Sequence, residues 1–189
     1  MNQLIGSFLD TQVGQLKLVA SDTALVAILW EDEDPNRVPL SEVTWNNTSP
    51  ILEETKKQLT EYFNLERKQF NLPLHIYEGS LSSRVWKALS DIPYGETRSY
   101  SELAETIGSP KAYRAVGLAN SKNPLSIVVP CHRVIAKSGK LSGFAGGISV
   151  KQALLRMERM EITSGGVAYT EDAFAPIETE GELRLWGLA

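Results

Sequence analysis

The sequence has a single cysteine and only two histidines in 189 residues. One cysteine cannot form a disulfide within the chain, which leaves the fold without covalent cross-links. One Cys and two His are also too few for a Cys-rich zinc site, so we expect no bound metal. A single cysteine is compatible with a reducing compartment, and we expect a cytoplasmic protein.

Long apolar runs are absent as well. No run approaches the roughly 18 consecutive residues that a membrane-spanning helix requires, and we expect no contact with membranes. The opening residues, MNQLIGSFLDTQVG, contain neither a basic segment nor a long apolar segment, so no secretory signal is visible. The content of 42% hydrophobic and 22% charged residues is typical of globular proteins with one or two small domains.

The net charge of −4 conceals a separation of charge along the chain. Residues 1–80 contain 6 Lys or Arg against 12 Asp or Glu, a net charge of −6. Residues 81–160 contain 12 against 5, a net charge of +7, and residues 161–189 contain 1 against 6, a net charge of −5. A basic segment between acidic ones indicates a local site for a polyanion, although a solvated basic face without a partner would leave the same pattern.

Residues 1–80 have the pattern of a small α/β domain, which we interpret as a scaffold. Apolar residues alternate over 16–20 and again over 25–29, on either side of a turn, which predicts an antiparallel hairpin. The pair Ser49-Pro50 is typical of a helix start, and apolar residues at helical spacing follow it. The segment FNLPLHIY at 70–77 predicts a short edge strand, because its internal proline cannot donate a hydrogen bond.

Residues 81–162 change to a helical pattern, which predicts a second, mainly α domain. The segment SYSELAETIGSPKAYRAVGLAN gives a short helix beginning near Ser101, a turn at Gly108, and a second helix from about 111 to 119. Two helices joined by a tight turn form a candidate helix-turn-helix. Helical hairpins of this length are also common in protein cores, so the pattern alone is a weak signal.

The second helix of this pair has an unusual composition for a DNA-reading helix. Ala112 and Ala115 are small and allow close approach, whereas Lys111 and Arg114 supply positive charge. Few long polar side chains are present to read base edges in a major groove. Small residues around one arginine suit contact with a minor groove, and they suit packing against a neighbouring helix as well.

The last predicted helix covers residues 149–161 and is followed by an acidic tail. Glu158 borders the apolar stripe of this helix, where its carboxylate needs a partner, and Lys151 is expected to point outward. Residues 163–189 are acidic and contain glycine, and we expect a flexible tail with at most local order.

The one cysteine, Cys131, follows an apolar run and a proline and precedes His132. A thiol with the usual pKa of about 8.5 is mostly protonated at neutral pH and needs a base to act as a nucleophile. Neighbours on an extended segment point in opposite directions, but a bridging water could carry the proton from Cys131 to His132. Glu158 is the best candidate to orient the imidazole, which completes a relay in the style of a hydrolytic triad.

Two other interpretations of Cys131 remain open on these residues alone. A lone cysteine is often a small buried apolar residue without a chemical role. A cysteine hydrolase would use the same relay, but it would also need an oxyanion hole and a substrate pocket, of which no other segment gives a sign.

The motif PCHRV at 130–134 resembles the signature of the O6-alkylguanine-DNA alkyltransferases, also called methylated-DNA–protein-cysteine methyltransferases. The resemblance covers residues of about 82 to 161, through IPYGETRSYSELA, SPKAYRAVG, NP, VPCHRVI, SGFAGG and KQALLRMER in that order. It implies an α/β N-terminal domain (antiparallel sheet plus helix) followed by a mainly α C-terminal domain with a winged-helix-like helix-turn-helix. Residues 1–80 resemble the family's N-terminal domain only in layout.

The resemblance also implies a reaction. A member of this family binds double-stranded DNA through the minor groove, turns the damaged guanine out of the duplex, and moves the alkyl group from O6 to its own cysteine. The thioether is stable, so each molecule acts once, and the chemistry needs no cofactor. We expect the same here from a monomer, with O6-alkylguanine as the lesion and O4-alkylthymine as a plausible second one.

By the same resemblance, Cys131 is the alkyl acceptor, His132 the water-linked base and Glu158 the residue that orients His132. Tyr100 crowds the phosphate of the target nucleotide and can donate its hydroxyl to the guanine. Arg114 fills the space that the flipped base leaves. The residues expected to contact DNA are Tyr100, Lys111, Ala112, Arg114 and Ala115.

The resemblance places further residues at the substrate pocket. Asn123 joins the recognition helix to the active-site segment and braces the turn. The backbone carbonyls of Cys131 and Val134 accept from the guanine amino group, and Phe144 and Ala145 line the pocket. The family commonly has tyrosine where this chain has Phe144, which leaves the range of accepted alkyl groups open. Relatives that only bind lesions lack the cysteine, so Cys131 favours transfer over binding alone.

Overall fold

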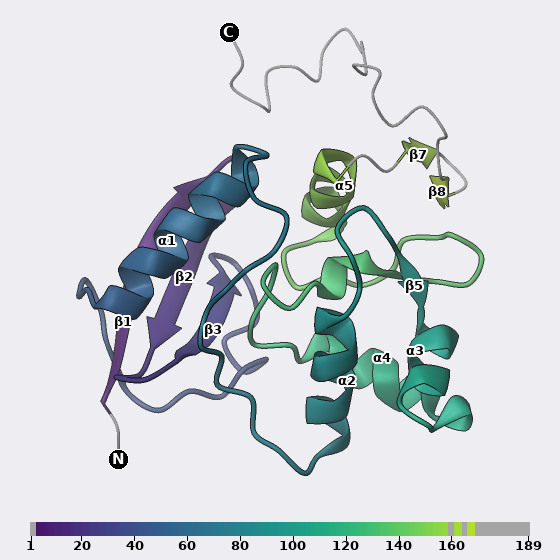
Figure 1. Ribbon diagram of the computed structural model, residues 1–189, viewed down its shortest axis with the longest axis horizontal. Helices are drawn as coiled ribbons and strands as arrows, with labels where there is room; N and C mark the ends of the chain where they lie inside the picture. Colours follow the sequence, from purple (N-terminus) through teal and green to yellow (C-terminus); the bar gives the residue numbers. More distant parts are fainter. Residues whose placement is uncertain (1–2, 159–160, 164–165, 169–189) are drawn as a thin grey trace, which may run out of the picture.

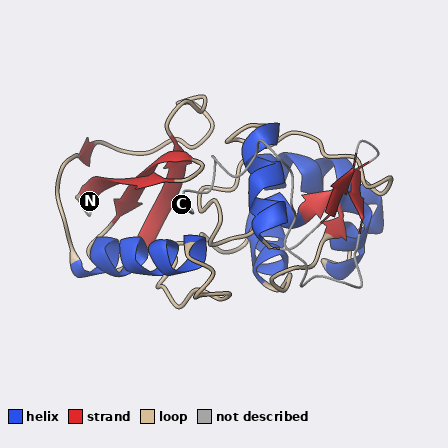
Figure 2. Cartoon of the chain, turned by 90° about the horizontal axis from the view of Figure 1, so that it is seen from above, coloured by secondary structure: helices blue, strands red, loops and turns tan. Residues whose placement is uncertain are grey.

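The computed structural model describes residues 3–158, 161–163 and 166–168. These residues form a sheet domain with one long helix, followed by a domain that is mainly helical (Figures 1 and 2). The predicted fold class, an α/β domain followed by a mainly α domain with a helix-turn-helix, is confirmed.

The N-terminal domain is built on a four-stranded sheet with strand order β3-β2-β1-β4. Three strands are antiparallel neighbours, and the fourth pairs in parallel with β1; their bounds are β1 (Leu4–Thr11), β2 (Gly14–Ala20), β3 (Leu25–Trp30) and β4 (Val43–Thr44). The predicted hairpin is present as β2 and β3. The sequence pattern does not predict β1, because the buried Gly6 and Ser7 interrupt its apolar alternation.

One helix, α1 (Pro50–Phe63), covers one face of this sheet (Figure 2). It begins as predicted, because the Ser49 side chain accepts a hydrogen bond from the Leu52 amide and Pro50 occupies the first turn. The predicted strand at 70–77 is wrong in extent. Only Leu74 forms a bridge, to Leu25, with two backbone hydrogen bonds of 2.8 Å on either side of it.

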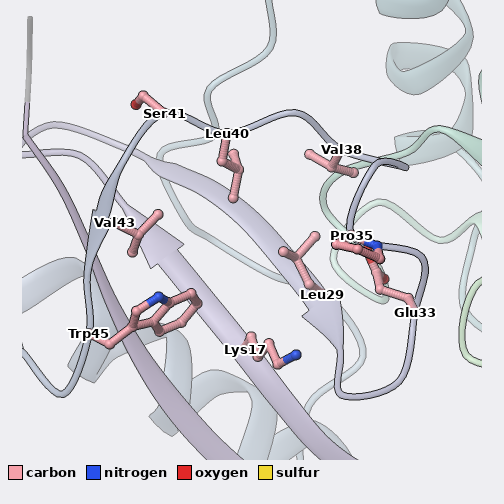
Figure 3. A pocket seen from close by; sticks show the side chains of 9 residues that line it. All are labelled: Lys17, Leu29, Glu33, Pro35, Val38, Leu40, Ser41, Val43 and Trp45. Atoms are coloured by element: carbon pink, nitrogen blue, oxygen red, sulfur yellow. The ribbon is translucent and has the colours of Figure 1, made fainter.

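The opposite face of the sheet is covered by the loop between β3 and β4 (Figure 3). A cavity of about 330 Å³ lies between this loop and the sheet. At its edge the indole of Trp45 stacks on Phe8, with ring centroids 5.1 Å apart. The cavity is lined by Lys17, Leu29, Glu33, Pro35, Val38, Leu40, Ser41, Val43 and Trp45, all from the N-terminal domain.

Three helices form the first part of the C-terminal domain: α2 (Leu81–Ser90), α3 (Tyr100–Thr106) and α4 (Tyr113–Ser121). They pack against one another, and α3 and α4 form the predicted helix-turn-helix. The predicted bounds of its second helix, 111–119, need correction. Lys111 and Ala112 belong to a 3-10 turn, η1 (Pro110–Ala112), and the α-helix continues to Ser121.

The chain then passes through a buried segment to a second 3-10 turn, η2 (Cys131–Arg133). The strand β6 (Val134–Ile135) follows and pairs in parallel with β5 (Arg98–Ser99). Next comes α5 (Ile148–Met157), which ends four residues earlier than predicted, with Glu158 as its C-cap.

The strands β7 (Glu161–Thr163) and β8 (Gly166–Ala168) form an antiparallel pair after α5. β8 lies inside the segment 163–189 that the sequence predicts as a flexible tail. Residues 169–189 of that segment lie outside the described residues.

The two domains share one hydrophobic core. The Ile28 amide of β3 donates to the Pro124 carbonyl at 2.8 Å, and Trp30 at the end of β3 packs edge-on against Phe144, with ring centroids 5.5 Å apart. The sheet therefore contacts the chain both before and after Cys131, so the N-terminal domain helps to fix the position of that segment.

The start of α3 is closed by a capping box. Ser99 Oγ accepts from the Glu102 amide at 3.2 Å, and the Glu102 carboxylate accepts from the Ser99 amide at 2.6 Å. We expect Ser99→Ala to lower the free energy of unfolding by about 1 kcal/mol, because it removes the side-chain acceptor at the N-cap. Urea denaturation followed by circular dichroism measures the change.

The matched control is Ser90→Ala at the exposed end of α2, where the hydroxyl only donates back to the Trp86 carbonyl. We expect this control to change the unfolding free energy by less than about 0.5 kcal/mol. Equal effects of the two substitutions would contradict the assigned role of the Ser99 cap.

Candidate active site around Cys131

Cys131 lies at the start of η2, and its side chain is 4% exposed. The preceding residues from Asn123 onward are all buried. Within them Ile127 has φ of 72°, a left-handed conformation that is strained for a β-branched residue. The backbone turns tightly here, since the Val128 amide donates to Ser126 and the Cys131 amide to Val129. This segment therefore holds the sulfur in one fixed position.

The Asn123 side chain makes two hydrogen bonds within that segment. Its Nδ2 donates to the Val129 carbonyl at 2.8 Å, and its Oδ1 accepts from the Leu125 amide at 3.0 Å. The side chain is 1% exposed, so both hydrogen bonds are shielded from water. Asn123 therefore closes a loop that ends two residues before Cys131.

Arg37 of the N-terminal domain supports the same segment, and sequence reasoning missed it. Its Nη1 donates to the carbonyl of Asn123 at 2.6 Å and to that of Ser121 at 3.3 Å. Its guanidinium is held in turn by Glu33, at 2.6 Å between Nη2 and Oε2. Arg37 therefore also supplies positive charge at the C-terminal end of α4, where the helix dipole favours a cation.

Glu158 accepts hydrogen bonds from four other residues. On Oε1 the donors are His132 Nε2 at 2.9 Å, Arg133 Nη2 at 2.9 Å and Tyr62 Oη at 2.6 Å. On Oε2 they are Arg133 Nε at 2.8 Å and the Gly95 amide at 3.3 Å. Sequence reasoning placed Glu158 beside His132 but missed Tyr62 and Arg133.

The charge state of Glu158 determines the tautomer of His132. Burial alone would raise the pKa of Glu158, but the hydrogen bonds and charges of His132 and Arg133 outweigh it and hold that pKa well below its usual range. An ionised carboxylate can only accept, so His132 Nε2 must carry the proton. Burial lowers the pKa of His132, and Glu158 offsets only part of that effect. At neutral pH the imidazole is therefore neutral, with a lone pair on Nδ1.

That Nδ1 atom is buried and has no hydrogen-bond partner in the described part of the chain. A buried, unpaired acceptor is costly unless a solvent molecule or a substrate group meets it. Burial also raises the pKa of the Cys131 thiol, and a hydrogen bond with Asn123 lowers it only in part. The site therefore combines a protonated thiol with a neutral base whose proton-accepting atom is free.

Lys151 was expected to point outward from its helix, and this expectation is wrong. The side chain is fully buried, and Nζ donates to the Val134 carbonyl at 2.6 Å and to the Ser142 carbonyl at 3.2 Å. Burial lowers its pKa to about 8, and Cys131 works in the opposite direction. Lys151 turns inward because it ties the loop after β6 to the strand, where two carbonyls replace the hydration of its ammonium group.

Three of the predicted pocket residues, Val134, Phe144 and Ala145, lie in β6 and in the loop after it. Val134 is buried, and its carbonyl accepts from Lys151 Nζ. Phe144 and Ala145 are half-buried in the loop after β6, and Phe144 packs on Trp30. A side chain at Gly146 would come within 2.6 Å of the Trp30 ring, so glycine is needed for this close approach.

The predicted DNA-contact residues lie together on α3, η1 and α4. Tyr100 begins α3, with its ring against Gly117 of α4. Arg114 is exposed at the start of α4, and its guanidinium carbon lies 5.8 Å from the centre of the exposed Tyr113 ring. Lys111 is exposed, and Ala112 and Ala115 are half-buried.

Two family models match the chain in the order of its domains. One is described as 6-O-methylguanine DNA methyltransferase, ribonuclease-like domain, and matches residues 4–76. The other is described as 6-O-methylguanine DNA methyltransferase, DNA binding domain, and matches residues 80–160. No helix in the residues described is long and apolar enough to cross a bilayer.

Named relatives agree with these models. The methylated-DNA–protein-cysteine methyltransferase of Mycolicibacterium paratuberculosis is 45% identical over 152 residues, which cover 79% of this chain and 89% of that protein. The protein of the same name from Methanosarcina acetivorans is 49% identical over 115 residues, covering 61% of this chain and 74% of that protein.

Among solved structures, Mycobacterium tuberculosis OGT in complex with DNA matches with a TM-score of 0.75 and 42% identity, covering 82% of this chain and 92% of that one. The likeness in sequence and in fold extends over both domains, and it includes the segment that carries Cys131. The chain belongs to the 6-O-methylguanine DNA methyltransferase family.

Proposed function

We propose that this protein repairs O6-alkylguanine in DNA by moving the alkyl group onto the sulfur of Cys131. It is a methylated-DNA–protein-cysteine methyltransferase, and each molecule acts once. The observation that carries this proposal is a buried lone cysteine next to an imidazole whose tautomer Glu158 fixes. O4-alkylthymine is the second lesion that the same chemistry would accept.

The resting site is arranged for a proton transfer that accompanies alkyl transfer. The Cys131 thiol gives its proton through a solvent molecule to Nδ1 of His132, and Glu158 stabilises the imidazolium that forms. The Sγ–C bond forms as the bond between O6 and the alkyl carbon breaks, and the electron pair of that bond stays on the guanine. The Tyr100 hydroxyl donates to the guanine ring and makes it a better leaving group.

Single turnover follows from the product. A thioether on a buried sulfur has no good leaving group, so no water can regenerate the thiol at a useful rate. The reaction therefore consumes one protein molecule for each lesion, and it requires no cofactor. In the residues described, no three His, Cys, Asp or Glu side chains cluster to hold a metal ion.

DNA binding is assigned to α3, η1 and α4. The M. tuberculosis relative has been crystallised with DNA, which supports DNA as the partner of this family member. We assign double-stranded DNA bound through the minor groove, with Arg114 in the space left by the flipped base and Tyr100 beside the target phosphate. Exposed Lys111 adds charge next to the small residues Ala112 and Ala115, which permit close approach to the backbone.

The flipped base is assigned to the space between Asn123, Val134 and the loop with Phe144 and Ala145. The Val134 carbonyl and the Cys131 carbonyl accept from the guanine amino group. We place the domain boundary near residue 80, with DNA binding and transfer in residues 81–162 and the acidic tail from 163. We further assign the protein to the cytoplasm as a monomer, without membrane contact.

Intact-mass measurement tests the central assignment. We expect excess duplex DNA containing O6-methylguanine to add one methyl group per chain, and peptide mapping to locate it on Cys131. Cys131→Ala should bind the same duplex and gain no mass, because no other cysteine is present. Repeated demethylation by one molecule would favour a hydrolase, and lesion binding without any mass change would favour a module that only binds DNA.

Arg114 can be tested by comparing two substrates. We expect Arg114→Ala to slow methyl transfer from duplex DNA by about tenfold or more, because a flipped base then lacks a replacement in the stack. Transfer from free O6-methylguanine should stay within about twofold of the original protein, since no base has to be flipped. Lys57→Ala, which removes one exposed cation from α1, is the matched charge control. Equal losses on both substrates would contradict the role of Arg114.

A further inference from the structure

Tyr62 connects the N-terminal domain to the active site. It lies near the end of α1, is fully buried, and donates its hydroxyl proton to Glu158 Oε1 at 2.6 Å, across 96 positions of sequence. Its ring packs against Phe63, Phe70 and Tyr94, with centroid distances of 5.4 to 6.2 Å. The cap of α1 does not involve this hydroxyl, since the helix is capped by Ser49 at its start and by Asn64 at its end.

The hydroxyl competes with His132 for the same oxygen. A carboxylate offers about four lone-pair sites, and Glu158 receives five donor contacts, three of them on Oε1. Each additional donor on Oε1 draws electron density from it and weakens the bond to the others. The phenol oxygen of Tyr62 lies 2.6 Å from Glu158 Oε1. Tyr62 stays protonated, because burial and then the charge of Glu158 raise its pKa well above the usual value.

We propose that Tyr62 is a positioning residue of the transfer reaction, whose hydroxyl limits how strongly Glu158 stabilises the protonated form of His132. The inference rests on the proposed function, in which His132 is the base. Its consequence is that the N-terminal domain adjusts the basicity of the imidazole, so that His132 stays neutral and able to accept the thiol proton at neutral pH.

The charged and titratable groups near His132 come from several elements. Lys151 lies in α5 and Glu158 is the C-cap of that helix, Arg133 and Cys131 flank His132 in η2, Tyr62 of α1 contacts Glu158, and Tyr94 packs on Tyr62 and Arg133. Arg133 and Lys151 oppose protonation of His132, and Glu158 favours it. The Tyr62 hydroxyl is a neutral donor, so its removal changes the hydrogen bonding of Glu158 without changing any formal charge in the site.

The direction of the effect follows. Without the Tyr62 hydroxyl, more negative charge remains on Oε1, the bond from His132 Nε2 strengthens, and the imidazolium gains stability relative to the imidazole. The pKa of His132 then rises. A higher pKa means that the neutral base is lost at a higher pH as the solution is acidified, so the acidic limb of the transfer rate moves toward neutral pH.

Nuclear magnetic resonance of the two histidines tests this with Tyr62→Phe. His75→Gln identifies the signals of His132, because the chain has no third histidine. We expect the Nε2 proton of His132 to move downfield at neutral pH in Tyr62→Phe, as its hydrogen bond to Glu158 shortens. We also expect a shift in the pH profile of methyl transfer from duplex DNA to Cys131. The midpoint of its acidic limb should rise by about half a pH unit or more.

Tyr94→Phe is the matched control, since it removes a hydroxyl from the neighbouring ring that donates to the Met157 carbonyl. We expect it to leave both observables of His132 unchanged. A structural role alone would lower the melting temperature of Tyr62→Phe and move neither observable. An unmoved Nε2 proton in folded Tyr62→Phe overturns the inference, whereas a wild-type protein that gains no methyl group overturns the proposed function instead.

Discussion

The ionised carboxylate of Glu158 is the group on which the rest of the site depends. Removing a carboxylate from water costs several kcal/mol unless charge and hydrogen bonds replace its hydration. Here Arg133 forms a bidentate ion pair with the carboxylate. The remaining hydrogen bonds to Glu158 come from Tyr62, His132 and the Gly95 amide. These donors come from α1, a turn after α2, and η2, so the charge can stay buried only when both domains are assembled. The assembled protein in turn fixes the His132 tautomer, because an ionised acceptor leaves one arrangement of the proton.

Contacts from within the segment before Cys131 and from the N-terminal domain hold its strained conformation in place. Ile127 adopts φ of 72°, which isolated chains avoid. The loop keeps this conformation because Asn123 closes it from inside and Arg37 holds its first carbonyl from the N-terminal domain. Such a segment leaves the sulfur little freedom to move. The entropy cost of positioning the sulfur is therefore met during folding and does not add to the barrier of the reaction. The sheet domain therefore does more than carry the helical domain.

The sequence predicts what depends on local pattern and misses what depends on distant contacts. The β2–β3 hairpin, the Ser49 cap and the two helices around Gly108 follow from alternation, capping residues and turn residues close together in the chain. Glu158 is found because helical spacing brings it to the edge of an apolar stripe. Arg37 and Tyr62 are missed, since they reach their partners across 86 and 96 positions, and no local signal separates them from surface residues.

The charge pattern of the sequence also changes meaning once burial is known. The basic segment 81–160 contains 12 Lys or Arg, which suggests a uniformly positive face. Arg133 and Lys151 are buried, where they hold Glu158 and the Val134 carbonyl and cannot meet a phosphate. The charge open to a polyanion is therefore smaller than the count suggests, and it includes the exposed cations Lys111 in η1 and Arg114 at the start of α4. The exposed and the buried cations of this basic segment therefore have different surroundings, and a net charge cannot distinguish them.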